Sequence, residues 1–269
     1  MRMRVIVRVL ALLAAASTTG TGGPMPPDET RAAAVETERR SGYSWLSPET
    51  QRLQDDEFAN PGMLWVEAGK ALWNESAGAS GESCASCHGD AAQSMRTVAT
   101  RYPAYSRAAA RVINLEQQVN RCRTLRQRVS GFIYESKDLL ALTAFISYQA
   151  RGLPMNVAID GPSRQSYERG KTFFNTRRGQ LNLSCANCHE QHAGGHLRGE
   201  PITQGQVNGF PIYRLLWQTM GSTHRMFAWC NEAVRAEPFA AGSQPYVDLE
   251  LFERWRGRGL PIETPAIRR

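Results

Sequence analysis

Residues 84–88 have the sequence Cys-Ala-Ser-Cys-His, and the same spacing returns as Cys-Ala-Asn-Cys-His at residues 185–189. Cys-x-x-Cys-His is the attachment signature of c-type haem, in which the two cysteines bond the porphyrin and the adjacent histidine is the proximal ligand of the iron. Two copies therefore predict two covalently attached haem c groups. The predicted haem-binding cysteines are Cys84, Cys87, Cys185 and Cys188, and the predicted proximal ligands are His88 and His189.

The sequence around the two motifs repeats as well. Gly69 and Gly170 stand at the same distance before the first haem cysteine of their copy, and a lysine follows each of them. Beyond the motifs, a Pro-x-Tyr sequence precedes Cys122 in the first copy and precedes Cys230 by the same distance in the second. Each copy then closes with Arg-Gly-Leu-Pro. Matching flanks of this kind indicate two tandem copies of one small haem domain.

The domain boundaries follow from this repeat. We expect a first cytochrome c-like domain at residues 40–158 and a second one at residues 159–269, because helical periodicity stops in a turn-rich stretch near residue 160. Apolar side chains at helical spacing, such as Leu139 and Leu142, predict helices around each haem, whereas strand signals are sparse. The expected fold class is mostly α, with two tandem cytochrome c-like haem domains and long loops.

The N-terminus has the pattern of an export signal. Three arginines precede an apolar run at residues 9–16, which ends in small residues and is too short to span a bilayer. We therefore expect a signal peptide at residues 1–19 and a location in the periplasm, where c-type haem attachment takes place. No later stretch predicts a membrane span. The formal net charge of +7 falls to +4 without the leader, which is not the excess of a nucleic-acid-binding protein.

Two cysteines remain after the haem motifs, Cys122 and Cys230. Because both follow Pro-x-Tyr at the same distance, we interpret them as the distal iron ligands, so that the metal-binding set is His88, Cys122, His189 and Cys230. A thiolate ligand donates charge to ferric iron and lowers its reduction potential. A haem with this ligand is therefore poorly suited to simple electron transfer.

Other readings of these two cysteines, and other distal ligands, stay open. The two cysteines could instead form a disulfide or be two inert buried thiols. The other candidate ligands are Met95, Met155, Met220, Met226, His192, His196 and His224.

The region around Cys230 resembles one family in particular. Residues 204–214 (QGQVNGFPIYR), 221–225 (GSTHR) and 235–238 (RAEP), together with Cys230 itself, are similar to the SoxA family of haem-bearing subunits in SoxAX cytochrome complexes. The resemblance implies an exported L-cysteine S-thiosulfotransferase that pairs with a small cytochrome c, SoxX, as a heterodimer. It also implies the reaction: thiosulfate is joined to a cysteine of the carrier protein SoxYZ, and two electrons pass through haem to the partner cytochrome.

The same resemblance assigns roles to residues. It implies that Cys230 is both the distal ligand of the second haem and the catalytic cysteine, carried as a persulfide, and that Cys122 ligates the first haem. The family has an arginine at the position of Met226, so Arg225 or Arg235 must supply the positive charge for the substrate anion. We take Arg225 as the catalytic candidate, and a salt bridge to a haem propionate is its alternative role.

Other functions remain possible on the sequence alone. A dihaem electron-transfer cytochrome would use the same haem motifs without substrate chemistry. A thiosulfate dehydrogenase that forms tetrathionate would use the same His/Cys ligation, and a haem peroxidase would need an open iron.

Overall fold

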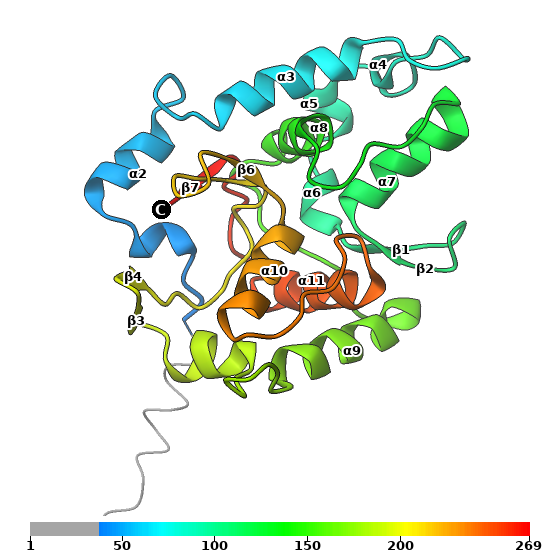
Figure 1. Ribbon diagram of the computed structural model, residues 1–269. Helices are drawn as coiled ribbons and strands as arrows, with labels where there is room; N and C mark the ends of the chain where they lie inside the picture. Colours follow the sequence, from blue (N-terminus) through cyan, green and yellow to red (C-terminus); the bar gives the residue numbers. More distant parts are fainter. Residues whose placement is uncertain (1–37) are drawn as a thin grey trace, which may run out of the picture. The chain divides into compact units, whose positions relative to one another are not determined.

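Helices dominate the computed structural model, which describes residues 38–269 (Figure 1). The expectation of a mostly α-helical fold is confirmed. Residues 39–269 group into one unit, so the predicted boundary between residues 158 and 159 stays a prediction. The predicted signal peptide at residues 1–19 lies outside the described residues. None of the helices in residues 38–269 has the length and apolar character of a membrane span.

The elements follow one another in a similar order in the two halves. The first half contains η1 (Gly42–Trp45), α2 (Pro48–Asp55), α3 (Met63–Asn74), α4 (Cys84–His88), α5 (Ala91–Ser94), α6 (Val98–Arg101), β1 (Ala104–Ser106), β2 (Arg111–Ile113), α7 (Leu115–Cys122), η2 (Arg123–Gln127) and α8 (Lys137–Tyr148). The second half contains η3 (Gly161–Ser163), α9 (Arg164–Asn175), η4 (Asn187–Gln191), β3 (His196–Leu197), β4 (Glu200–Pro201), β5 (Ile212–Arg214), β6 (Thr219–Gly221), α10 (Thr223–Ala233), α11 (Gln244–Arg256) and β7 (Ala266–Arg268).

Two helix pairs form the framework, α3 against α8 and α9 against α11 (Figure 1). Each pair crosses at the glycine that the sequence repeat singles out. A Cβ atom on Gly69 would lie 2.1 Å from the carbonyl oxygen of Ala141, and one on Gly170 would lie 2.0 Å from that of Asp248. Only glycine permits such an approach between backbones. The two halves therefore share one close helix crossing.

Short hairpins lead into the helices that carry Cys122 and Cys230. Strand β1 pairs antiparallel with β2, and β5 pairs antiparallel with β6 and parallel with the C-terminal strand β7. Asn114 then caps α7, and its side chain accepts a hydrogen bond from the backbone N–H of Gln117. Ser222 caps α10 in the same way through the N–H groups of His224 and Arg225. These caps fix where each cysteine-bearing helix begins.

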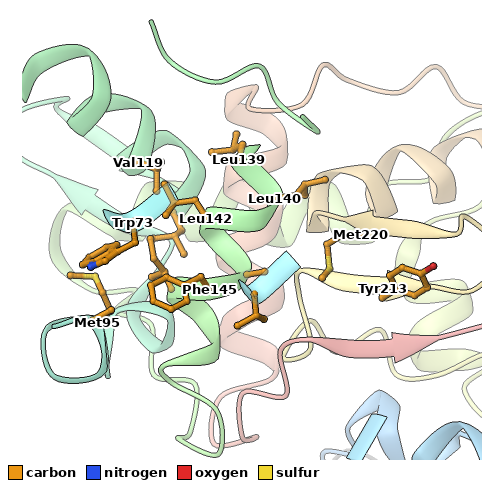
Figure 2. Close-up of a cluster of buried hydrophobic side chains, with 14 of the residues drawn as sticks. Trp73, Met95, Val119, Leu139, Leu140, Leu142, Phe145, Tyr213 and Met220 are labelled. Carbon is orange, nitrogen blue, oxygen red and sulfur yellow. The ribbon is translucent and has the colours of Figure 1, made fainter. Parts of the chain in front are cut away.

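The hydrophobic core lies on both sides of α8, whose residues from Leu139 to Ser147 are all buried. Figure 2 shows Trp73, Val119, Leu142 and Phe145 gathered near α8, with Met220 and Tyr213 farther along toward the β5–β6 hairpin. A second cluster surrounds α11. Its buried aromatic members are Tyr167, Phe173, Phe174, Phe227, Tyr246 and Phe252.

The closing segments of the two copies pair with each other. The N–H of Met155 donates to the carbonyl of Leu260, and the N–H of Ile262 donates to the carbonyl of Leu153, each at 2.9 Å. These two bonds are reciprocal, because Met155 and Ile262 hold equivalent positions in the repeat, as do Leu153 and Leu260. The two halves therefore meet through an approximate two-fold relation at the Arg-Gly-Leu-Pro segments.

Candidate functional site

The first haem motif occupies the short helix α4 next to the end of α7. Ser83 and Ser86 form a capping box that starts α4 at Cys84. His88 is exposed, and its ring centroid lies 5.8 Å from that of Trp73. Burial raises the pKa of Cys84, and the neighbouring thiol of Cys122 raises it further. The structure therefore brings Cys122 close to the first motif.

The second motif is held more tightly. Its histidine, His189, has its Nδ1 atom 2.8 Å from the carbonyl oxygen of Thr203. Because a carbonyl only accepts, Nδ1 carries the proton, and Nε2 is the nitrogen left for a metal. Burial lowers the pKa of His189, which favours the neutral imidazole that a ligand must be. Gly205 packs on the ring, since a Cβ atom there would lie 2.8 Å from Cγ of His189.

Cys230 lies on α10 and faces this second motif. It is half-buried, and burial raises its pKa to about 11, with a further contribution from the thiol of Cys188. The guanidinium of Arg214 acts in the opposite direction. All six cysteines lie among the described residues and are free, so the alternative of a disulfide between Cys122 and Cys230 is wrong.

The donor set fits haem c. Each motif offers two free thiols and an imidazole, and a further thiol lies close by. Near the second motif, the buried Nε atom of Arg178 has no hydrogen-bond partner among residues 38–269, and its positive charge lowers the pKa of Cys185. An unsatisfied guanidinium nitrogen beside a haem motif suits a propionate carboxylate. These residues would hold the porphyrin, and the histidines and cysteines would hold its iron.

A buried ion pair borders the same site. Glu253 and Arg256 on α11 pair at 2.8 Å, and Arg256 also donates to the carbonyl of Gln204. Burial raises the pKa of Glu253 to about 7. The carboxyl group of Glu253 in turn raises the pKa of both Cys185 and Cys230. Neither residue was picked out by sequence reasoning, because both sit in an ordinary amphipathic helix pattern.

The methionines that the sequence offered as alternative distal ligands have other surroundings. Met95, Met155 and Met220 are buried core residues, and Sδ of Met155 accepts a hydrogen bond from Arg254. Met226 is half-buried, and its Sδ atom accepts one from Arg214.

The histidines that the sequence offered as alternative distal ligands also have other surroundings. His224 is 1% exposed, its Nε2 atom lies 3.1 Å from Glu250, and its Nδ1 accepts the backbone N–H of Gly242. His192 and His196 are exposed. The core contacts of His224 therefore occupy both of its ring nitrogens.

The cations near Cys230 form a group with two tryptophans. The guanidinium of Arg225 lies over the ring of Trp217 at 4.4 Å from its centroid, and Nη1 reaches the carbonyl of Met220 at 3.4 Å. The guanidinium of Arg214 lies 4.7 Å from the ring centroid of Trp229 and 5.2 Å from that of Trp217.

The third arginine that the sequence offered, Arg235, is exposed and has a left-handed φ of 57°. Its guanidinium reaches Gln180 at 3.5 Å. Arg214 was missed on sequence, because it stands 16 residues before Cys230 in the chain and only the β5–β6 hairpin brings it near α10.

Known proteins resemble this chain over most of its length. Residues 68–155 match the family model described as SoxA/TsdA, cytochrome c domain. The L-cysteine S-thiosulfotransferase subunit SoxA of Rhodovulum sulfidophilum is 42% identical over 231 residues, covering 86% of this chain and 80% of that protein. The protein of that name in Pseudaminobacter salicylatoxidans is 42% identical over 247 residues, covering 90% of this chain and 86% of its own. A chain in the crystal structure of SoxXA from P. pantotrophus has a TM-score of 0.85 and 38% identity, covering 89% of this chain and 90% of that one.

Proposed function

Because the chain belongs to the SoxA family, we propose that it is the haem-bearing subunit of a periplasmic L-cysteine S-thiosulfotransferase that acts on thiosulfate. Its cytochrome c domain indicates covalently bound haem c. We propose two such haems, one on each Cys-x-x-Cys-His motif. The observation that carries the proposal is the position of Cys230, a half-buried thiol close to the second motif and to the guanidinium of Arg214.

The proposed reaction joins thiosulfate to a cysteine thiolate of the carrier protein SoxYZ. A bond forms between the outer sulfur of thiosulfate and the cysteine sulfur, and two electrons are released. The thiolate brings one negative charge and thiosulfate brings two. The product keeps one negative charge, and the two electrons carry away the others. When bound, haem supplies a one-electron acceptor for this oxidation.

Cys230 is proposed to hold the thiosulfate before it is transferred. As a persulfide, its outer sulfur bonds the outer sulfur of thiosulfate while two electrons leave. The carrier thiolate then attacks the sulfur derived from thiosulfate, which forms the carrier–thiosulfate bond and regenerates the Cys230 persulfide. Arg225 is proposed to contribute positive charge for the incoming dianion, since it lies five residues before Cys230 on the same helix.

The partners of this reaction follow from the family. The similar chain from P. pantotrophus was solved as SoxXA, and we propose that this chain likewise pairs with a small SoxX-type cytochrome c. That cytochrome would receive the two electrons one at a time. SoxYZ would bring the acceptor cysteine, so both partners are needed for a complete turnover.

The test compares two equivalent cysteines. We expect Cys230→Ala to abolish thiosulfate-dependent reduction of the partner cytochrome, because it removes the sulfur on which transfer takes place, while mass analysis still finds both haems attached. Cys122→Ala is the matched control, with the same change near the first motif, and it should retain turnover. Full turnover by the Cys230→Ala protein would sink the proposal.

Product analysis distinguishes the proposed activity from the two alternative functions. A thiosulfate dehydrogenase would release free tetrathionate without any carrier protein, whereas the proposed enzyme leaves the sulfur on the SoxYZ cysteine. A plain electron carrier would exchange electrons with other cytochromes at a rate independent of thiosulfate. Mass analysis of the carrier after reaction, together with tetrathionate determination, distinguishes these three outcomes.

A further inference from the structure

The helix that carries Cys230 is held at its start by a residue of the first copy. Ser222 caps α10, and its Oγ atom accepts hydrogen bonds from the backbone N–H groups of His224 and Arg225. Its hydroxyl proton is donated to Oε1 of Glu135, and its backbone N–H reaches Oε2 of the same carboxylate at 3.4 Å. A hydroxyl has one proton and two lone pairs, so all three are used here. The carboxylate therefore fixes the orientation of the cap.

Glu135 occupies a backbone position that is unfavourable for a glutamate. Its φ is 63°, in the left-handed region, and it stands directly before Ser136, the residue that caps α8. The second copy has Gly242 at the equivalent position, directly before Ser243, with φ of 79°. Glycine adopts this conformation without strain, whereas a residue with a Cβ atom is strained there. The first copy thus has a strained glutamate where glycine would suit the backbone, and its side chain reaches the second copy.

The opposite contact exists as well. Asn114 caps α7, the helix that carries Cys122, and its Nδ2 atom donates to Oε2 of Glu250 at 3.2 Å. Glu250 lies on α11 of the second copy. Asn114 and Ser222 are equivalent in the repeat, since each lies eight residues before the cysteine of its own helix. Each copy therefore supplies a carboxylate to the cap of the other copy's cysteine-bearing helix.

We propose that Glu135 is a positioning residue for Cys230, through which the first copy sets the placement of the cysteine in the second. This inference rests on the proposed function. Cys230 lies eight residues beyond Ser222, about 12 Å along the helix axis, so a small tilt at the cap displaces the thiol. A displacement of about 1 Å can lower a rate about a hundredfold although every reacting group is still present. Glu135 therefore acts on the reaction through the cap of α10, without contact to the substrate.

The test compares three variants of the haem-loaded protein with its partner cytochrome. Glu135→Gly removes the carboxylate and relaxes the backbone, so the chain should still fold. We expect it to lower kcat for thiosulfate-dependent cytochrome reduction about tenfold or more, with KM within about twofold, because substrate contacts are kept. Glu135→Gln, whose amide oxygen can still accept the Ser222 hydroxyl, should recover most of the lost rate. Ser136→Ala is the control: it removes the neighbouring cap of α8, which lowers stability, and should leave kcat unchanged.

A second readout does not depend on turnover. His189→Met identifies the electron paramagnetic resonance signal of the second ferric haem, because it replaces the proximal ligand of that haem. Glu135→Gly should shift or broaden the same signal and leave the other one unchanged, although Glu135 belongs to the first copy. An unchanged signal overturns the inference, and so does an equal change in Ser136→Ala or an unaltered kcat in an active protein. If the wild-type protein shows no thiosulfate-dependent turnover but Glu135→Gly alters the signal of the second haem, the proposed function fails and the positioning role stands.

Discussion

The two predicted proximal histidines differ in how their rings are held. Nδ1 of His189 is fixed by the carbonyl of Thr203, and Gly205 lies against the face of the ring. His88 is exposed, and the tilted ring of Trp73 lies near it. A ligand whose second nitrogen is bonded keeps one tautomer and one orientation. We therefore expect the iron of the haem proposed at the second motif to have the more sharply defined ligand geometry.

This difference predicts the effect of Gly205→Ala. Gly205 has φ of 71°, and the new Cβ would press on Cγ of His189, so the imidazole must move. We expect altered electron paramagnetic resonance of one of the two ferric haems and an unchanged signal from the other. The backbone strain alone costs about 1–2 kcal/mol.

Gly199→Ala is the matched control for that strain. It lies in the same loop region with φ of 81°, and an added Cβ there meets no atom within 4 Å. Its stability should fall similarly, while both haem signals stay unchanged. Identical spectra for the two variants would show that Gly205 does not position the histidine.

At the scale of helices, each half depends on a crossing where two backbones touch. Gly69→Ala and Gly170→Ala would each push a methyl group into a carbonyl of the partner helix. Because backbone on both sides cannot yield cheaply, we expect each variant to lose about 3 kcal/mol or more of unfolding free energy. Chemical denaturation measures this loss. The adjacent exposed residues provide controls, and Lys70→Ala and Lys171→Ala should change stability by less than about 0.5 kcal/mol.

The sequence predicted those elements well that are marked by the internal repeat or by apolar residues at helical spacing. The apolar spacing at Leu139 and Leu142 predicted α8, and the repeated glycines marked both crossings. One of the long loops, residues 194–210, contains the two-residue strands β3 and β4, which are too short to leave a pattern in the sequence.

Contacts between residues that lie far apart in the sequence were not predicted. Arg214 reaches Met226 only through the hairpin register, and no local pattern reports that register. His224 was a candidate haem ligand on sequence. It pairs instead with Glu250, which arrives from α11, so its role depends on tertiary packing. The proximity of Cys122 to the first haem motif and of Cys230 to the second was easier to infer, because the repeat presented the same spacing twice.

At the scale of the whole molecule, the two halves enclose a buried polar cluster. Glu250 on α11 accepts from Asn114 at 3.2 Å and pairs with His224 on α10. Glu116 on α7, 8% exposed, lies beside them. A cavity of about 10 Å³ borders Glu116, Glu250 and Arg254, roughly the space of one water molecule. Charged groups from both repeats are thus kept away from solvent at their junction.

This cluster predicts how stability depends on pH. Burial, and to a smaller extent the neighbouring Glu250, raises the pKa of Glu116 from 4.5 to about 7, and His224 opposes the rise. The folded state therefore binds a proton that the unfolded state releases between about pH 4.5 and pH 7. Stability is highest at the acid end of that window and falls as the pH rises through it, by an amount on the order of 3 kcal/mol from this group.

Glu116→Gln tests that assignment, because the amide imitates the neutral carboxyl group. Urea denaturation of the haem-loaded protein between pH 5 and pH 8 should show a shallower decline for the variant than for the wild type. Glu253, whose pKa is also raised to about 7, retains part of the slope in both proteins. Parallel curves would mean that Glu116 is not the group that titrates.

The reciprocal bonds between residues 153–155 and 260–262 also set the order in which the polypeptide can mature. A nascent chain that has emerged only as far as residue 158 lacks the partners of Leu153 and Met155, and those backbone groups stay hydrated until the last residues arrive. Closure of the junction therefore waits until residues 260–262 have been synthesised. Until then, the first copy cannot be locked against the second through these bonds.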